Sequence, residues 1–201
     1  MRTINAGIGE RYSATEIRDI VISVAVLSVA FAIMFSRAGW RGFTMLELIG
    51  ISAIIVCTSF VIHELAHKFV AQRLGAWAEY RMYPFGLMLA LMLSFMGVIF
   101  AAPGVVYING YIDDEDNGKI SAAGPAVNII MGTFAVIMAY MTGGVLSSIF
   151  WIMATINAFF AVFNMIPILP FDGSKIFKWN VAVYLLTVAA AVALLAVAWF
   201  G

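Results

Sequence analysis

The most constraining feature of this sequence is an apolar run of 27 residues, 45–71, that carries three ionisable side chains close together. A run of this length can cross a membrane as a tilted helix. His63, Glu64 and His67 lie in its C-terminal half, and an ionisable group at membrane depth costs at least about 2.5 kcal/mol. Such a helix needs a strong compensating partner, and a bound cation is the simplest one.

The spacing of these side chains predicts a metal site. His63 and His67, the only histidines of the chain, are four residues apart. On an α-helix they share one face about 6 Å apart, so both imidazoles can reach one metal ion. Glu64 lies beside them, as the general base does in the His-Glu-x-x-His motif of zinc-dependent hydrolases. The alternative is that all three are hydrogen-bonded polar groups of a buried helix.

The composition predicts an all-α polytopic membrane protein. Hydrophobic residues make up 64% of the 201 residues, against about 45–50% in soluble domains. The expected spans are 20–35, 45–71, 122–140, 145–166 and 181–200, and the first is expected to remain as an anchor because it lacks the features of a signal peptide. Eleven basic residues balance eleven acidic ones, so the lipid bilayer is an expected partner and nucleic acid is not. The single cysteine, Cys57, excludes an intrachain disulfide and a cysteine-based zinc cluster.

The stretch 84–103 is ambiguous, because its length and hydropathy would also suit a membrane span. The residues that follow, 105–112, are expected to be extended. An acidic cluster at 113–116 is expected to lie in a solvated polar turn.

A catalytic zinc ion needs a third protein ligand. Asp172 is the best candidate, because Pro167 and Pro170 break a predicted membrane helix just before it. Irregular backbone at membrane depth is tolerated where it is buried in protein or lines a cavity. On this stretch alone, a turn that merely ends the span is an equally good interpretation.

Together, the motifs resemble those of the site-2 protease family of intramembrane zinc metalloproteases. The family pairs His-Glu-x-x-His with a later Asn-x-x-Pro-x-x-Pro-x-Asp-Gly, matched here by 164–173, and with Gly-Pro-x-x-Asn, matched by 124–128. The resemblance implies that His63, His67 and Asp172 bind Zn²⁺ and that Glu64 is the general base. It also implies that Asn128 and Asn164 contact the substrate or the oxyanion.

The same resemblance implies a single membrane metalloprotease domain over 1–201, with a catalytic core at about 45–173. The chain departs from the family pattern at Ser174, where a second glycine is usual, and no stretch resembles a PDZ or CBS domain. These departures leave the mode of substrate selection open. The implied activity is hydrolysis of peptide bonds in membrane-spanning proteins.

Topology requires 84–103 to enter the membrane and return. If this stretch crossed fully, Asp172 would lie on the opposite side of the membrane from His67. The five-span arrangement, with a re-entrant segment that the family resemblance implies to be β, places nine basic residues on one side and Arg37 and Arg41 on the other. A six-span arrangement divides them six to five. The positive-inside rule then predicts a multi-pass protein of the cell membrane with its active site toward the cytoplasm.

Two alternatives to this function remain at this point. A zinc protease of the CAAX-processing type would use a glutamate as third ligand, and Glu79 and Glu115 are the available ones. An inactive relative, or a metal-binding membrane protein without peptidase activity, would need the ligands but not Glu64.

Overall fold

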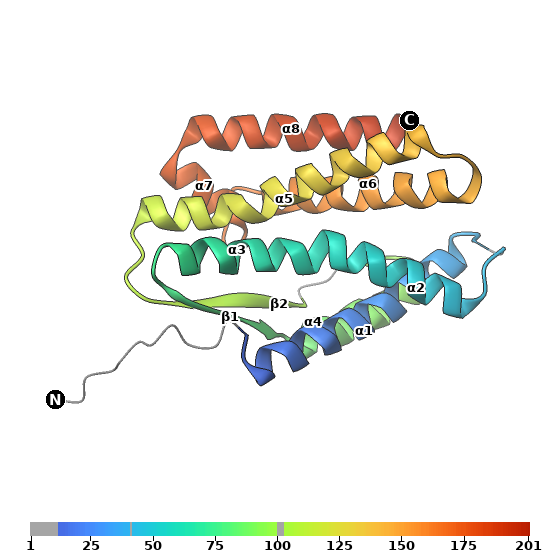
Figure 1. Cartoon of the computed structure of the whole chain (residues 1–201), viewed down its shortest axis with the longest axis horizontal. Helices are drawn as coiled ribbons and strands as arrows, with labels where there is room; N and C mark the ends of the chain where they lie inside the picture. Colours follow the sequence, from blue (N-terminus) through green and yellow to red (C-terminus); the bar gives the residue numbers. More distant parts are fainter. Residues whose placement is uncertain (1–11, 41, 100–102) are drawn as a thin grey trace.

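Five long apolar helices run along the longest dimension of the protein (Figure 1). The computed structural model describes residues 12–40, 42–99 and 103–201, and within these ranges five helices have the length and composition of membrane spans. They are α1 (Ala14–Arg37), the continuous helix Met45–Arg73, α5 (Asp114–Met141), α6 (Gly144–Asn164) and α8 (Val181–Phe200). The predicted all-α polytopic architecture is confirmed, and each predicted span falls on one of these helices apart from one or two terminal residues.

The second span changes its helical geometry just before the histidines. It begins with a capping box in which Thr44 and Glu47 cap each other's backbone N–H groups. The α-helical part α2 (Met45–Val56) is followed by the π-helical turn η1 (Cys57–Val61) and then by α3 (Ile62–Arg73). Single π-helical turns of this kind are frequent at functional sites.

In the stretch between the second and third spans, two paired strands hold the two ends of a short helical segment together. Strand β1 (Trp77–Met82) pairs antiparallel with β2 (Gly104–Asn109), so that Met82 faces Gly104 across the ladder. Between them, α4 (Pro84–Ser94) has 11 residues and is about 16 Å long, roughly half of a bilayer's hydrocarbon core. The segment therefore does not cross, and β2 accounts for most of the predicted extended stretch.

Two sequence-based expectations were wrong. The acidic cluster after β2 is the capped first turn of α5 and not a loop, because the Asp113 side chain accepts from the Asp116 N–H and carboxylates suit a helix N-terminus. Lys68, one of the nine basic residues assigned to one side of the membrane, was expected to mark the exit of the second span, but it is buried and donates to Glu16 of α1 at 2.5 Å. Of the basic residues in the predicted charge asymmetry, Arg2, Arg11 and Arg41 lie outside the described residues.

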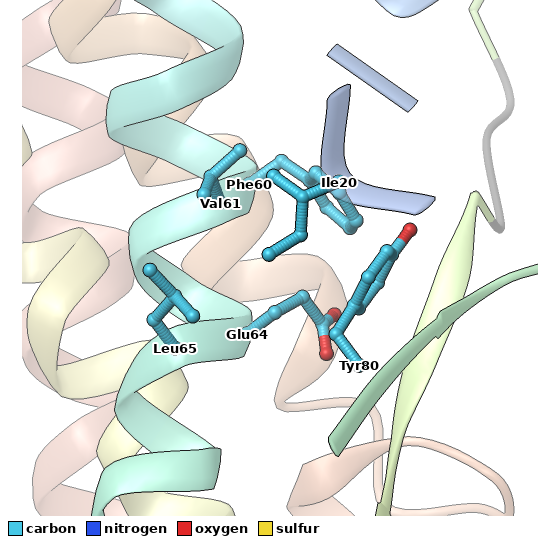
Figure 2. Close-up of a pocket in the computed structure, with 6 residues that line it drawn as sticks. All are labelled: Ile20, Phe60, Val61, Glu64, Leu65 and Tyr80. Carbon is cyan, nitrogen blue, oxygen red and sulfur yellow. The ribbon is translucent and has the colours of Figure 1, made fainter. Parts of the chain in front are cut away.

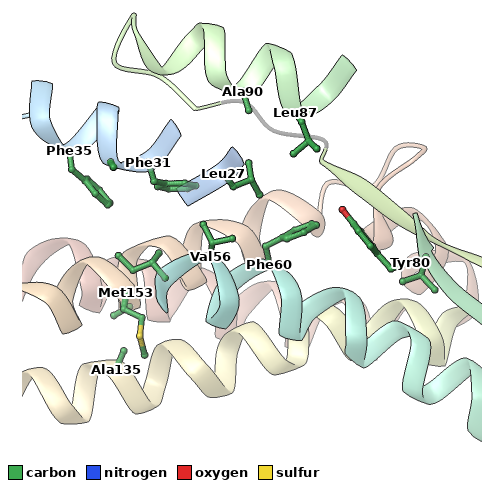
Figure 3. Close-up of a cluster of buried hydrophobic side chains, with 14 of the residues drawn as sticks. Leu27, Phe31, Phe35, Val56, Phe60, Tyr80, Leu87, Ala90, Ala135 and Met153 are labelled. Carbon is green, nitrogen blue, oxygen red and sulfur yellow. The ribbon is translucent and has the colours of Figure 1, made fainter. Parts of the chain in front are cut away.

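The apolar core joins α1, the second span and the hairpin (Figure 3). Leu27 and Phe31 of α1 point toward Val56 and Phe60, and Leu87 of α4 lies above them. Tyr80 of β1 closes this core near the site: its ring packs edge-on against Phe60, and its hydroxyl hydrogen-bonds Ser23 and donates to the Pro103 carbonyl. Burial raises the pKa of the Tyr80 hydroxyl, so it remains protonated as a donor.

The remaining helices bring the C-terminal motif to the histidines. Helices α5 and α6 form a hairpin, and α7 (Asp172–Trp179) folds back against the start of α5 (Figure 1). Close packing requires glycine where α7 meets the end of α6 and where it meets α5. A Cβ on Gly173 would lie 2.3 Å from the carbonyl oxygen of Met165 after α6, and a Cβ on Gly118 of α5 would lie 2.3 Å from the Trp179 side chain. Asp172, the first residue of α7, is thereby held against α3.

Candidate metal centre

The two histidines converge on one point. His63 and His67 project from successive turns of α3, both are buried, and their ring centroids are 4.6 Å apart. Their Nε2 atoms are 3.0 Å apart. Two imidazole nitrogens this close can bind a common cation.

Asp172 supplies a third donor at the same point. Its Oδ2 atom lies 3.4 Å from Nε2 of His63 and 3.2 Å from Nε2 of His67. Donors about 2.0–2.1 Å from a tetrahedral zinc ion are about 3.3 Å apart, so the three observed separations match a zinc ligand set. Among the described residues, these three form the group of His, Cys, Asp or Glu side chains that could hold a metal ion.

The electrostatics of Asp172 also suit a metal ligand. Burial by itself raises the pKa of this carboxyl, but the imidazoles of His67 and His63 outweigh burial and hold the pKa below its usual range. The Lys175 ammonium lies 4.0 Å from Oδ1, the oxygen that does not face the histidines. The carboxyl is thus kept ionised, which is the form that binds a cation.

The other ring nitrogens fix which atom faces the metal position. His63 Nδ1 donates to the Asn128 side-chain oxygen at 2.6 Å, and His67 Nδ1 donates to the Ile120 carbonyl at 2.7 Å. Since the proton of each neutral ring is then on Nδ1, the lone pair of each Nε2 is free for a metal. Gly124 lies directly beneath both rings, because a Cβ there would be 2.5 Å from His63 Cε1 and from His67 Nε2.

Glu64 faces a different side of α3. Its side chain extends toward Tyr80 of β1, with Ile20 of α1 and Phe60 beside it (Figure 2). These residues line a cavity of about 10 Å³, which is room for about one water molecule. The half-buried Glu64 carboxylate therefore borders this cavity, one residue along the helix from His63.

The structure places the remaining candidates differently. Asn128 is buried and contacts His63, whereas Asn164, at the end of α6, is half-buried and donates to the Phe160 carbonyl of its own helix. Glu79 forms an ion pair with Arg81, and the exposed Glu115 pairs with Lys119 at 2.7 Å. Neither glutamate belongs to the donor group formed by the described residues, so the CAAX-type ligand set gains no support.

Sequence reasoning missed two contributors to this centre. The Ile120 carbonyl left no signal, because any residue type carries that group. Asn157 of α6, which hydrogen-bonds Asn128, did leave one: it is an uncharged polar residue inside a predicted span, and polar residues at membrane depth are functional candidates.

Comparisons with known proteins agree with this centre. The profile described as Peptidase family M50 matches residues 140–193, which include Asn164 and Asp172. A protein of Methanocaldococcus jannaschii named "Putative zinc metalloprotease MJ0611" is 43% identical over 176 residues, which cover 85% of this chain and 87% of that protein.

Two more distant relatives have similar names. "Putative zinc metalloprotease Rip3" of Mycobacterium tuberculosis is 29% identical over 132 residues, 63% of this chain but 30% of that protein. "Zinc metalloprotease MJ0392" of M. jannaschii is 25% identical over 127 residues, 62% of this chain and 32% of that protein. No solved structure matches the chain.

The identity to MJ0611 extends over most of both chains, and the zinc-type donor set lies within a bundle of membrane-spanning helices. The resemblance inferred from the motifs is confirmed. The chain is an integral, multi-pass membrane zinc metalloprotease and belongs to peptidase family M50, the site-2 protease family.

Proposed function

We propose that this protease hydrolyses peptide bonds within membrane-spanning proteins, near the cytoplasmic side of the cell membrane. In this proposal His63, His67 and Asp172 hold the zinc ion, Glu64 is the general base, and 1–201 acts as a single domain with its catalytic core at about 45–173. The observation that carries the proposal is the position of the donor set within a helix that is long and apolar enough to span a membrane. His63 lies ten residues before Arg73, the end of its helix, and therefore about 15 Å along a membrane-spanning helix.

The position of the donor set along the helix indicates the kind of substrate. The hydrocarbon core of a bilayer is about 30 Å thick, so a bond cut beside His63 and His67 lies inside it. Backbone groups inside a bilayer are hydrogen-bonded within helices or barrels. The substrate is therefore a membrane-spanning segment that must locally unwind before its carbonyl can be attacked.

Each polar group of the centre has a part in the chemistry. When bound, zinc polarises the scissile carbonyl and makes a water molecule acidic enough to attack near neutral pH. Glu64 accepts the proton of that water and then donates a proton to the leaving amine. The half-buried Asn164, eight residues before Asp172, contacts the substrate or its oxyanion. The Asn128 side chain is hydrogen-bonded to His63 and to the Ser59 carbonyl, so its role is to hold the His63 ring in place.

The outer edge of β2 is suited to hold an unwound segment. The N–H of Tyr80 donates to Glu16 at 2.9 Å, so Tyr80 and its partner Val106 are a pair of the ladder without mutual hydrogen bonds. The N–H and C=O of Val106 therefore point away from β1. No hydrogen bond from the described residues reaches that side of β2, which leaves an edge that an extended peptide can join.

The charge distribution supports the orientation. Arg18, Arg73, Lys119, Lys175 and Lys178 lie at the end of the bundle where α1 and α5 begin and α3 ends, and Arg37 lies at the opposite end (Figure 1). Basic residues near span ends favour the cytoplasm. In a Cys57→Ser background, a membrane-impermeant thiol reagent added to intact cells should label a cysteine at position 37 and leave one at 178 unlabelled. The reverse pattern would contradict the orientation.

Cleavage in a defined membrane tests the proposed activity. The purified chain and its Glu64→Gln variant are each reconstituted in vesicles with single-span reporter proteins, and the product ends are mapped by mass spectrometry. We expect wild type to cut bonds within the apolar span. Glu64→Gln should cut the same bonds far more slowly. Cuts confined to aqueous flanking sequence would contradict the proposal.

A further inference from the structure

Asn157, in the middle of α6, is fully buried and lies one hydrogen bond away from the support of the metal centre. Its side-chain oxygen accepts from the Asn128 amide nitrogen at 3.0 Å, and its own amide nitrogen donates to the Met153 carbonyl at 2.9 Å. We infer that Asn157 is a positioning residue for zinc: it fixes the orientation of the Asn128 amide and, through it, that of the His63 ring.

The side-chain amide of Asn128 has two alternative orientations. The oxygen and nitrogen ends of Asn128 have nearly the same shape but opposite hydrogen-bonding character. With the oxygen toward His63, the ring carries its proton on Nδ1 and presents a free lone pair at Nε2. With the amide turned over, the nitrogen would face Nδ1, and the proton of a neutral ring would move to Nε2, where the metal must bind.

Two acceptors hold Asn128 in the productive orientation. The Ser59 carbonyl, in the π-helical turn η1, accepts from the Asn128 nitrogen at 2.7 Å, and Asn157 accepts from the same nitrogen. Turning the amide over would place its oxygen against both of these oxygens. In a buried site, where solvent cannot replace lost partners, such contacts are strongly unfavourable.

The orientation of Asn157 is fixed in turn by the backbone. Its nitrogen donates to the Met153 carbonyl, which cannot donate in return. The donors therefore run in one direction, from His63 to Asn128, to Asn157 and to Met153, across three helices. This order ends at a backbone group that cannot be reversed, so α6 determines the tautomer of a ligand on α3.

The inference rests on the proposed function, because it takes His63 as a zinc ligand. It is tested by zinc affinity, measured by chelator competition on the detergent-purified full chain. Loss of a group that orients a metal-ligating histidine costs about 10–100-fold in affinity. We expect Asn128→Ala to fall in this range and Asn157→Ala to weaken binding about tenfold, the low end of it.

Three further variants separate positioning from a general packing role. Asn157→Asp should retain near wild-type affinity, because a protonated carboxyl at membrane depth can accept from Asn128 and donate to Met153. Thr155 lies on the same helix as Asn157, and Thr155→Val loses side-chain hydrogen bonds to the Trp151 carbonyl of α6 and the Ala198 carbonyl of α8. This variant should bind zinc like wild type. If Asn157→Ala does not fold, Asn157→Ser replaces it, since its shorter side chain can reach Met153 but not Asn128.

The double variant Asn128→Ala/Asn157→Ala tests whether Asn157 acts on zinc binding through Asn128. If Asn157 acts through Asn128, the double variant binds zinc no more weakly than Asn128→Ala alone. Cobalt-substituted Asn157→Ala should also show an altered visible absorption spectrum, and cobalt-substituted Thr155→Val an unaltered one. Wild-type affinity in Asn157→Ala, or independent effects that multiply in the double variant, would overturn the inference. Full zinc binding by His63→Ala would instead overturn the proposed function on which it rests.

Discussion

Two adjacent faces of the same helix have opposite surroundings. Ser59, His63 and His67, each four residues from the next, face α5, and the polar atoms that they turn toward it are hydrogen-bonded by Asn128 or Ile120. Shifted by one residue, Phe60, Glu64 and Lys68 face α1 and β1 (Figure 2). A shift of one residue rotates the side chain by about 100°, so the helix separates the two histidines from Glu64.

The difference shows what each function requires of its surroundings. Metal ligands need fixed direction, and the histidine face provides it with directional bonds to a neighbouring helix. A general base, the role proposed for Glu64, must reach the substrate and a water molecule, and Glu64 borders a cavity with room for about one water molecule. Directional hydrogen bonds therefore fix the histidine face, whereas the Glu64 side chain borders a small cavity.

The largest effect on catalysis is expected from Glu64→Gln. The amide has nearly the shape of the carboxylate but cannot accept a proton, so the cleavage rate should fall by about 10²–10⁴-fold. Zinc content should remain that of wild type, because the histidine face is untouched. Glu47→Gln, in the capping box at the other end of the same span, is the control. Loss of zinc from Glu64→Gln would abolish the distinction between the two faces.

A loss of stability without a loss of zinc is expected from Glu16→Gln. The Glu16 carboxylate accepts from Lys68 and from the Tyr80 N–H, and it is fully buried. Breaking a buried ion pair of this kind costs about 3–5 kcal/mol. Chemical unfolding in detergent should show this decrease, whereas Glu115→Gln, in an exposed pair, should cost less than about 1 kcal/mol. An unchanged unfolding free energy would show that α1 does not depend on this contact.

A smaller effect is expected on the histidine face from Gly124→Ala. The added methyl group would lie within 2.5 Å of both imidazoles, so the rings must shift and zinc affinity should fall about 10–100-fold. Gly50→Ala, in the same membrane span as the histidines but with no atom within 4 Å of the added Cβ, should bind zinc like wild type. Chelator competition measures both, and equal affinities would mean that the histidine face is not rigid.

The sequence predicted the features that local chemistry determines. Span positions follow from apolar runs, and the meeting of Asp172 with the histidines follows from motif and topology together. The acidic residues at the start of α5 were misassigned although Asp113 and its neighbours carry a helix N-terminal signal. Long-range pairing explains the other misses: neither the burial of Lys68 by Glu16 nor the contact of Asn157 with Asn128 can be read from one segment.

The most direct test of the central claim is the zinc content of purified Asp172→Ala, compared with wild type, Glu79→Ala and Glu115→Ala. If His63, His67 and Asp172 hold the metal, elemental analysis should find about one zinc per chain in wild type and in both glutamate variants, and almost none in Asp172→Ala. One zinc per chain in Asp172→Ala, or its loss from Glu79→Ala alone, would contradict the account.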